Sequence, residues 1–183
     1  FTLVVGAAGR WHPAKDYTNL IAALAPICRV NAALCLKIAG RDINAQNAEL
    51  MAMLQRFEFP IEQCLLLDEV SDMANFYQDI DVFILPSKTE GFPNVLVEAM
   101  SYALPCITTD VGDAAFILNK PEWVVAPQSP KDLQIVVERV IALNHVERQS
   151  IANANQARVL AEFAISDISL RYHEAYQQAE CWG

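Results

Sequence analysis

Two acidic residues separated by seven others, Glu90 and Glu98, carry the most distinctive chemistry of the sequence. Glu90 follows a short apolar run that is typical of a buried strand, and Glu98 falls more than one turn inside a helix that starts near Asn94. Gly91 permits a backbone conformation or a close approach that a Cβ atom would block. Pro93 suits a first helical turn. We therefore predict that the two carboxylates face different parts of one crevice.

The helix start between the two carboxylates offers free backbone N–H groups, which favour a phosphate or another anion. A carboxylate, an amide cradle and a second carboxylate suit a ligand with hydroxyl groups at both ends and a phosphate in the middle. A nucleotide sugar has this chemistry. Two other interpretations of Glu90 and Glu98 stay open. They are exposed acids without a role, or the acid and nucleophile of a glycosidase, although such pairs usually come from separate elements.

Four of the 13 Lys and Arg residues fall in loops that follow predicted strands, namely Arg10, Lys15, Arg41 and Lys88. Ligands of doubly wound sheets bind beyond the carboxyl ends of the strands, so these residues predict a local positive rim there. The Arg10 guanidinium can hold two phosphate oxygens, and Lys15 adds a point charge for the same group. Together they can neutralise a diphosphate and the charge on a departing nucleoside diphosphate. The alternative for each is a solvated surface residue.

Short apolar runs alternate with helical patterns, which predicts an α/β fold with a Rossmann-like parallel sheet and helices on both faces. We expect strands at residues 2–8, 32–39, 64–67, 81–85, 105–108 and 123–126. We expect helices at residues 17–27, 44–57, 71–77, 94–102, 114–118, 129–143, 145–163 and 166–179, with Ser129 as a cap and Asp167 and Glu174 at polar positions. The dinucleotide fingerprint G-x-G-x-x-G is absent, which disfavours an ordinary NAD domain.

The composition limits the possible classes of protein. The 183 residues, 54% of them hydrophobic, suit one domain, and the formal net charge of −9 argues against a nucleic-acid partner. The sequence contains no apolar run of about 18 residues, the length that would predict a membrane span. The five cysteines form no C-x-x-C pair, so we expect them to be reduced and mostly buried; the scattered histidines argue against a zinc site. The sequence opens inside a strand-like run without Met or a signal pattern, so we expect it to be part of a longer protein.

Residues 90–98 read Glu-Gly-Phe-Pro-Asn-Val-Leu-Val-Glu. This stretch resembles the two-glutamate motif of retaining GT-B glycosyltransferases of family 4. Residues 5–16, 36–40, 81–87, 99–107 and 110–112 resemble further segments of the same family in the same order, so the resemblance covers nearly the whole chain. It implies the carboxyl-terminal half of a GT-B fold, with residues 1–183 as a single nucleotide-sugar-binding domain.

The resemblance implies a role for each matching position. Arg10 and Lys15 look like ligands of the donor diphosphate, and Glu90 looks like the acid that binds hydroxyls of the transferred sugar. These three are the candidate catalytic residues. Glu98 looks like the acceptor for the ribose hydroxyls. The loop and the helix start are implied to lie against sugar and phosphate through Gly91, Phe92, Pro93, Asn94, Val95 and Leu96.

The implied activity is transfer of a hexosyl group, with retention of configuration, from a nucleotide-diphosphate sugar to a saccharide or lipid-linked acceptor. UDP-sugar is the favoured donor, and no cofactor or metal is implied. An amino-terminal acceptor domain would lie outside this sequence, so the chain alone is expected to bind nucleotide without transferring sugar. The last helices, about residues 145–180, are candidates to pack toward that domain. We expect a cytoplasmic location, with contact to the inner face of the membrane left open, and a role in surface polysaccharide synthesis.

Some positions depart from the family pattern. Asp16 stands where the family usually has Gly, Trp11 where it often has Leu, and the loop after Gly112 lacks a frequent Glu. These departures affect the donor and the subfamily more than the fold. Two other functions stay open: a nucleotide-sugar epimerase on the same fold and a non-catalytic binding module. The joint presence of the basic pair and both glutamates argues against the binding module.

Overall fold

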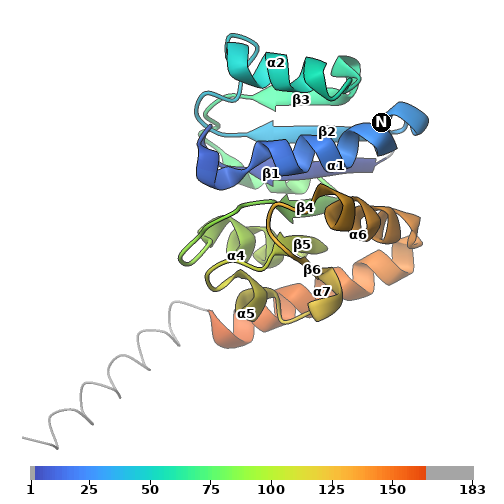
Figure 1. Cartoon of the computed structure of the whole chain (residues 1–183). Helices are drawn as coiled ribbons and strands as arrows, with labels where there is room; N and C mark the ends of the chain where they lie inside the picture. The colour runs from blue at the N-terminus through green and yellow to red at the C-terminus, as the bar shows by residue number, and fades with distance from the viewer. Residues whose placement is uncertain (1–2, 164–183) are drawn as a thin grey trace, which may run out of the picture.

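The structure is a computed structural model that describes residues 3–163. Its central element is a parallel sheet of six strands in the order β3-β2-β1-β4-β5-β6 (Figure 1). This order is the doubly wound, Rossmann-like arrangement that the alternating pattern predicts. The strands are β1 (Leu3–Ala8), β2 (Leu34–Ala39), β3 (Cys64–Leu67), β4 (Val82–Leu85), β5 (Cys106–Thr109) and β6 (Val124–Val125).

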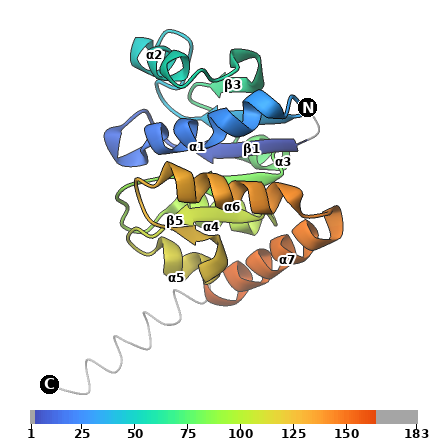
Figure 2. The same cartoon turned by 45° about the vertical axis from the view of Figure 1, so that its right-hand side comes forward.

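Helices cover both faces of the sheet. α1 and α6 lie side by side on the face toward the viewer in Figures 1 and 2, whereas α3 and α4 lie behind the sheet and α7 packs against α4. Short 3-10 turns, η1 (Pro13–Lys15), η2 (Ile61–Gln63) and η3 (Pro121–Trp123), precede α1, β3 and β6. The helices are α1 (Tyr17–Val30), α2 (Ala48–Arg56), α3 (Met73–Gln78), α4 (Asn94–Ser101), α5 (Ala114–Leu118), α6 (Pro130–Ala142) and α7 (His145–Glu162).

The inner strands are buried because both of their faces are covered by helices. Every residue of β4 and β5 is buried, and β2 departs from this only at Lys37. Behind the sheet, the rings of Phe76 and Tyr77 on α3 pack edge to face with each other, and Tyr77 packs in the same way on Phe83 of β4, at centroid distances of 5.4 and 6.0 Å. This packing fixes α3 against the sheet.

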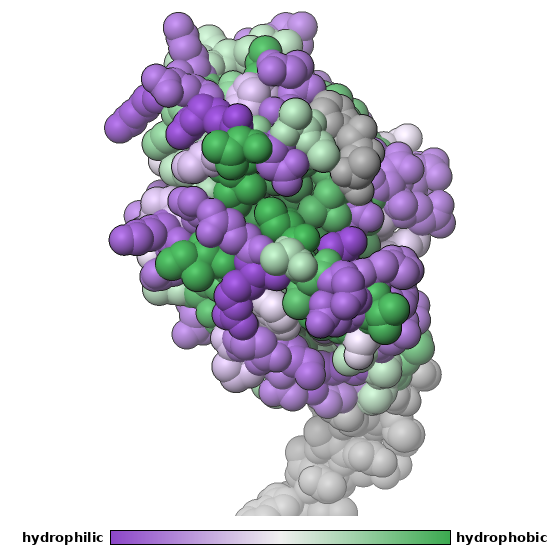
Figure 3. Space-filling view, turned by 90° about the vertical axis from the view of Figure 1, so that its right-hand side faces the viewer, coloured by the Kyte–Doolittle hydropathy of each residue, from purple (hydrophilic) through white to green (hydrophobic). Residues whose placement is uncertain are grey.

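All strands run in one direction, so the loops that follow them gather at one edge of the sheet, on the left in Figure 1. β1 pairs with β2 on one side and with β4 on the other, and the connections after β1 and β4 leave toward opposite faces. A switch of this kind opens a crevice at the carboxyl edge. Figure 3 shows the opposite edge, where hydrophobic side chains gather in the middle and hydrophilic ones border them.

Every strand and helix predicted within residues 3–163 is present, and most bounds agree to within two residues. The largest difference is at residues 44–47, which the periodicity assigns to a helix. Asn47 instead caps α2, since its side chain accepts a hydrogen bond from Leu50 N (3.1 Å), while Asn44 in the preceding loop donates to Asp68 (2.8 Å). Polar bonds therefore delay the helix.

One finer expectation about helix starts differs from the structure. Ser129 occupies the cap position of α6, but its hydroxyl donates to Asp132 Oδ2 (2.6 Å) and makes no cap bond to the backbone. The predicted start of α4 at Asn94 is confirmed, with Pro93 directly before it. The predicted helix at residues 166–179, with Asp167 and Glu174, lies outside the described residues.

Two side chains of α7 join it to the end of α4. The Asn155 amide donates to the Leu104 carbonyl (2.8 Å) across 51 residues of sequence, and the Gln156 amide donates to the Ser101 carbonyl (2.8 Å). The described part of the region 145–180 therefore packs on its own domain; its packing toward another domain stays a prediction. Within residues 3–163, no helix is both long and apolar enough to cross a membrane.

The cysteines that the structure describes are buried free thiols, as the sequence predicts: Cys28, Cys35, Cys64 and Cys106. Burial raises the pKa of Cys28 and of Cys64 to about 12, with a smaller contribution from the neighbouring Cys35. Burial also raises the pKa of the Cys106 thiol. Since the thiolate is the reactive form, these side chains are chemically inert in the folded chain.

We expect the four buried thiols to react with 5,5′-dithiobis(2-nitrobenzoic acid) at pH 8 only after unfolding, as measured by absorbance on a Cys181→Ser variant. All four should react at once in denaturant. Rapid labelling of the native variant would contradict this burial.

The pKa values of Cys28 and Cys64 are raised in the folded state from an ordinary value of 9.0 to about 12. The free energy of unfolding should therefore fall as the pH rises from about 9 toward 12, because the unfolded chain loses these protons first.

Glycines allow the loops at the carboxyl edge to touch. A Cβ atom at Gly40, which has a φ of +150°, would overlap the Gly9 carbonyl. A Cβ atom at Gly112, with a φ of +50°, would overlap the carbonyls of Glu90 and Gly91. At Gly91 itself a Cβ atom would meet nothing within 4 Å. Nothing in the described chain therefore requires glycine at position 91, and the close approach of a ligand there stays a prediction.

We expect Gly40→Ala to lower the free energy of unfolding by about 2 kcal/mol or more, because the added methyl group forces the loop after β1 away and strains the backbone. The measurement is urea denaturation followed by circular dichroism. Gly91→Ala is the matched control and should change stability by less than about 0.5 kcal/mol. Equal effects of the two substitutions would show that the loop contact does not hold the edge together.

Candidate functional site

A pocket of about 310 Å³ opens at the carboxyl edge, between the loops after β1 and β2 and the helices α3 and α4. Arg10 and Arg41 line it from the two loops, and Val95 and Glu98 line it from α4. Arg41 also forms an exposed ion pair with Glu69 on the rim (3.3 Å). The structure thus brings Arg10 and Glu98, predicted from separate motifs, to one cavity.

Glu98 is held on one side by a buried tyrosine. Its Oε2 atom accepts a hydrogen bond from the Tyr77 hydroxyl at 2.8 Å, while the residue as a whole remains exposed at the pocket. Burial of Tyr77, followed by this bond, raises the pKa of the phenol, so the hydroxyl stays protonated and can only donate to the carboxylate. The orientation of Glu98 is therefore set from the core, through α3.

Glu90 is held from two directions. Its Oε1 atom forms an ion pair with Lys15 Nζ (2.7 Å) and accepts a hydrogen bond from the Ser87 hydroxyl (2.6 Å). Ser87 is fully buried, and its carbonyl accepts a hydrogen bond from the buried Thr109 hydroxyl at the end of β5. The Lys15 and Glu90 side chains are only 22% and 13% exposed, so this pair is shielded from solvent more than a surface ion pair.

The start of α4 lies between the two glutamates along the chain. No side chain caps this helix, and the amide of Leu96 donates to the Pro93 carbonyl (3.0 Å). An uncapped helix start presents N–H groups and partial positive charge to its surroundings. Asn94 and Gly91 beside it are exposed. The local arrangement is therefore suited to an anion, and the binding of an anion here stays a prediction.

The predicted positive rim is divided between separate places. Arg10 and Arg41 lie at the pocket, whereas Lys15 is engaged with Glu90. Lys88 lines a different cavity on the α1 side. The division arises because the loop after β4 turns back over η1, where the Lys88 amide donates to the Ala14 carbonyl (2.9 Å).

Phe92, predicted to lie in the binding loop, is 45% exposed. Its ring meets the ring of Phe163, just after α7, at a centroid distance of 6.0 Å. Its side chain thus contacts the end of α7, and any contact of its backbone with a ligand stays a prediction.

Three residues that hold the glutamates were missed by sequence reasoning: Tyr77, Ser87 and Thr109. The signal for Ser87 is a hydroxyl residue directly after a strand that ends in proline, within an apolar stretch. Tyr77 reads only as an inward residue of a short helix, and Thr109 as the end of a strand. Their partners lie 21, 3 and 22 residues away, at Glu98, Glu90 and Ser87, so only the folded chain shows the first and last of these bonds.

The site combines two oriented carboxylates, a guanidinium, an ammonium group and an uncapped helix start at one sheet edge. Carboxylates accept hydrogen bonds from hydroxyl groups, and the cations and helix start stabilise negative charge. The arrangement can therefore bind a molecule that carries hydroxyls and an anionic group, and it can stabilise charge that develops on that group.

Comparisons with known proteins identify the family and the fold of the chain. The family described as glycosyl transferases group 1 matches residues 2–143. The capsular polysaccharide biosynthesis glycosyltransferase CapM of Staphylococcus aureus is 31% identical over 103 residues, which are 55% of this chain and 27% of that protein. The chain therefore spans about a quarter of the length of this relative.

Two solved structures share the fold. The C-terminal domain of a glycosyl transferase group 1 family protein (LpcC) from Francisella tularensis superposes with a TM-score of 0.77 at 20% identity, over 89% of this chain and 87% of that one. Anabaena Alr3699/HepE in complex with UDP-glucose gives a TM-score of 0.82 at 22% identity, over 97% of this chain and 49% of that one. The expected half of a GT-B fold is thereby confirmed. Because the family model matches residues 2–143, which are most of this chain, the chain belongs to the glycosyl transferases group 1 family.

Proposed function

We propose that the chain is the donor-binding domain of a retaining glycosyltransferase. The full-length enzyme would move a hexosyl group from a nucleotide-diphosphate sugar, most simply UDP-sugar, to a saccharide or lipid-linked saccharide during polysaccharide assembly. Support for the donor comes from the UDP-glucose complex of HepE, and support for the pathway from the name of CapM. The acceptor would bind through a further domain outside this sequence.

The observation that carries this proposal is the meeting of Arg10 and Glu98 at one pocket of about 310 Å³, beside the uncapped start of α4. One oxygen of Glu98 already accepts a bond from Tyr77, and the carboxylate has a second oxygen to accept the ribose hydroxyls. Arg10 and the helix start would hold the diphosphate. Glu90 would bind hydroxyls of the transferred sugar, and Gly91 leaves open space for its close approach.

In the proposed reaction, the bond from the anomeric carbon to the diphosphate oxygen breaks, and a bond to an acceptor hydroxyl oxygen forms on the same face of the sugar. The leaving diphosphate gains negative charge, which Arg10, Lys15 and the start of α4 would stabilise. The hydroxyl proton of the acceptor would pass to a donor phosphate oxygen. Glu90 would orient the sugar, since its contacts with Lys15 and Ser87 fix its position before the ligand arrives.

Calorimetric titration of the chain with UDP, GDP and ADP tests the donor site. We expect one nucleotide to bind, and Arg10→Ala and Glu98→Ala each to weaken that binding about 10- to 100-fold, because each removes charged hydrogen bonds. Arg56→Ala, an exposed arginine at the far end of α2, is the matched control and should leave affinity unchanged. Equal affinity for wild type and both site variants would contradict the assignment.

The hydrogen bond from Tyr77 to Glu98 allows a separate test. We expect Tyr77→Phe to weaken nucleotide binding about 3- to 10-fold, because Glu98 loses the donor that orients it, while stability falls by only about 1 kcal/mol. Tyr102→Phe is the control, since Tyr102 stacks on Tyr77 at a centroid distance of 5.2 Å but lies on the outer side. A Tyr77→Phe variant that binds as tightly as the Tyr102→Phe variant would rule out this role.

A further inference from the structure

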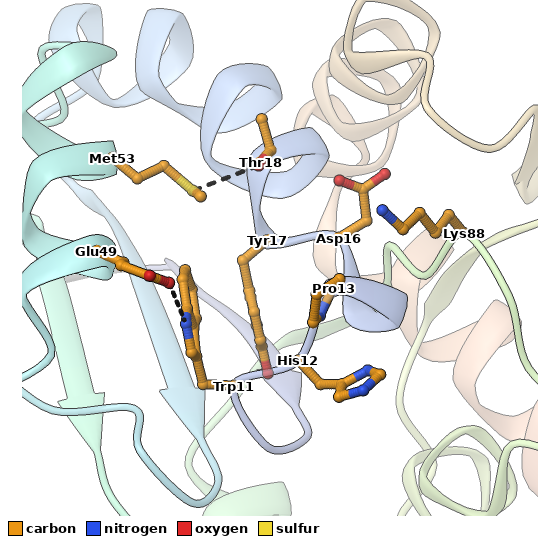
Figure 4. A pocket seen from close by; sticks show the side chains of 9 residues that line it. All are labelled: Trp11, His12, Pro13, Asp16, Tyr17, Thr18, Glu49, Met53 and Lys88. Carbon is orange, nitrogen blue, oxygen red and sulfur yellow. Dashed lines mark hydrogen bonds between the residues drawn. The ribbon is translucent and has the colours of Figure 1, made fainter.

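A second cavity, of about 230 Å³, lies on the α1 side of the carboxyl edge, and we call it the aromatic pocket. Figure 4 shows its lining, which comes from η1 and the start of α1, from α2, and from the loop after β4. None of its lining residues lines the pocket that holds Arg10 and Glu98. Adjacent parts of one segment line the two cavities, since Gly9 and Arg10 line the first and Trp11 and His12 line the second.

The aromatic pocket has an apolar floor and a polar border. The rings of Trp11 and the buried Tyr17 are stacked, with centroids 5.6 Å apart and planes 9° from parallel, and Met53 lies above them in Figure 4. Glu49 borders the floor from α2, where its Oε2 atom accepts a hydrogen bond from the Trp11 indole (3.2 Å). His12 borders the opposite side of the ring pair. A sugar ring is complementary to such a pocket, because its C–H faces are apolar and its hydroxyl groups form a polar border.

The charges of the aromatic pocket select against an anion. It carries two carboxylates, Glu49 and Asp16, and one ammonium group, Lys88. The Lys88 amino group points toward the Asp16 carboxylate in Figure 4, which leaves Glu49 on the other side of the cavity. The first pocket differs, because Arg10 and Arg41 line it. An uncharged ligand therefore suits the aromatic pocket, whereas the anionic nucleotide suits the first.

Asp16 and Trp11 shape the lining of the aromatic pocket. Asp16 has a φ of 47°, in the left-handed region that favours glycine, and its side chain accepts a hydrogen bond from Asn19 N (3.3 Å) to cap α1. Trp11 supplies both the ring and the donor that holds Glu49. The local backbone and this hydrogen bond therefore fix the polar and apolar sides of the pocket.

Resting on the proposed function, we propose that the aromatic pocket binds one uncharged sugar ring of the acceptor saccharide, while the rest of the acceptor binds through the further domain. The sugar ring would lie against the Trp11 ring, which the buried Tyr17 ring supports by stacking, and its hydroxyls would donate to Glu49. Because Arg10 and Trp11 are adjacent in sequence but line different cavities, the sugar ring would lie beside the donor site without overlap. The pocket would then help to select which growing saccharide receives the next sugar.

The test is a titration of the ¹⁵N-labelled chain, followed through the Trp11 indole N–H signal in the NMR spectrum. The probes are methyl glycosides of glucose, galactose, mannose and N-acetylglucosamine, with glucuronic acid as the charged comparison. We expect at least one neutral glycoside to shift the signal saturably, and glucuronic acid to bind at least threefold more weakly. Saturation with UDP should leave this binding in place.

Two variants assign the response to the pocket. Glu49→Gln, an exposed position on α2, should weaken glycoside binding at least threefold, and Trp11→Leu should abolish it when read by saturation-transfer NMR. Glu62→Gln is the control for Glu49→Gln, since Glu62 is an exposed acid in η2, away from the pocket. UDP affinity, measured on the same samples, should stay unchanged in all three variants.

The outcomes separate this proposal from the proposed function. If UDP binds but no neutral glycoside shifts the Trp11 signal, or if Glu49→Gln changes nothing, the aromatic pocket is not a sugar site and the donor site stands. If UDP displaces the glycoside, the ring lies in the donor site and the proposal is wrong. If glycosides bind at Trp11 but no nucleotide binds, the sugar site stands and the donor assignment fails.

Discussion

The ion pair between Lys15 and Glu90 joins the two loops that the sheet topology would otherwise separate. The loops after the paired strands β1 and β4 begin side by side, but the chain then leaves them toward opposite faces. The ion pair (2.7 Å) and the backbone bond from Lys88 to Ala14 (2.9 Å) connect them side by side. The donor pocket, the start of α4 and the aromatic pocket all take their positions from these joined loops.

Each glutamate uses one oxygen for the chain itself. Glu98 accepts from Tyr77, and the Oε1 atom of Glu90 is shared by Lys15 and Ser87. Carboxylates held in this way lose less conformational freedom when a ligand binds than free surface acids do. The conformational entropy of the two carboxylates is lost during folding instead, since Tyr77 is fixed by aromatic packing and Ser87 by a buried hydrogen bond from Thr109.

The sequence predicts well what depends on local patterns. The succession of strands along the chain and the position of Arg10 at the carboxyl edge follow from alternating apolar runs and from the position of residues after strands. A common ligand for Arg10 and Glu98 is implied only by the family resemblance. Long-range partners are a different matter. The Tyr77 and Thr109 bonds, and the turn of the loop that takes Lys88 to the α1 side, depend on how distant elements pack.

The requirement for glycine is a second property that local sequence does not predict. Gly40 and Gly91 both lie in or next to loops at the sheet edge, so the local sequence gives no reason to distinguish them. Only the folded chain shows that Gly40 touches the Gly9 carbonyl while Gly91 faces open space. A requirement for glycine can therefore arise from a neighbour that is remote in sequence, or from a molecule that the chain does not contain.

The bonds from α7 to the end of α4 have a consequence for the order in which the chain matures on the ribosome. The six strands of the described part of the chain all precede residue 126. The buried Leu104 carbonyl, beyond the helix that carries Glu98, accepts a hydrogen bond from the nearby Cys106 thiol (3.3 Å) and gains its amide donor only at Asn155. Buried carbonyls are stabilised by such donors. The central helix of the site is therefore completed by residues that are translated after these strands, so the sheet can form before its functional edge is finished.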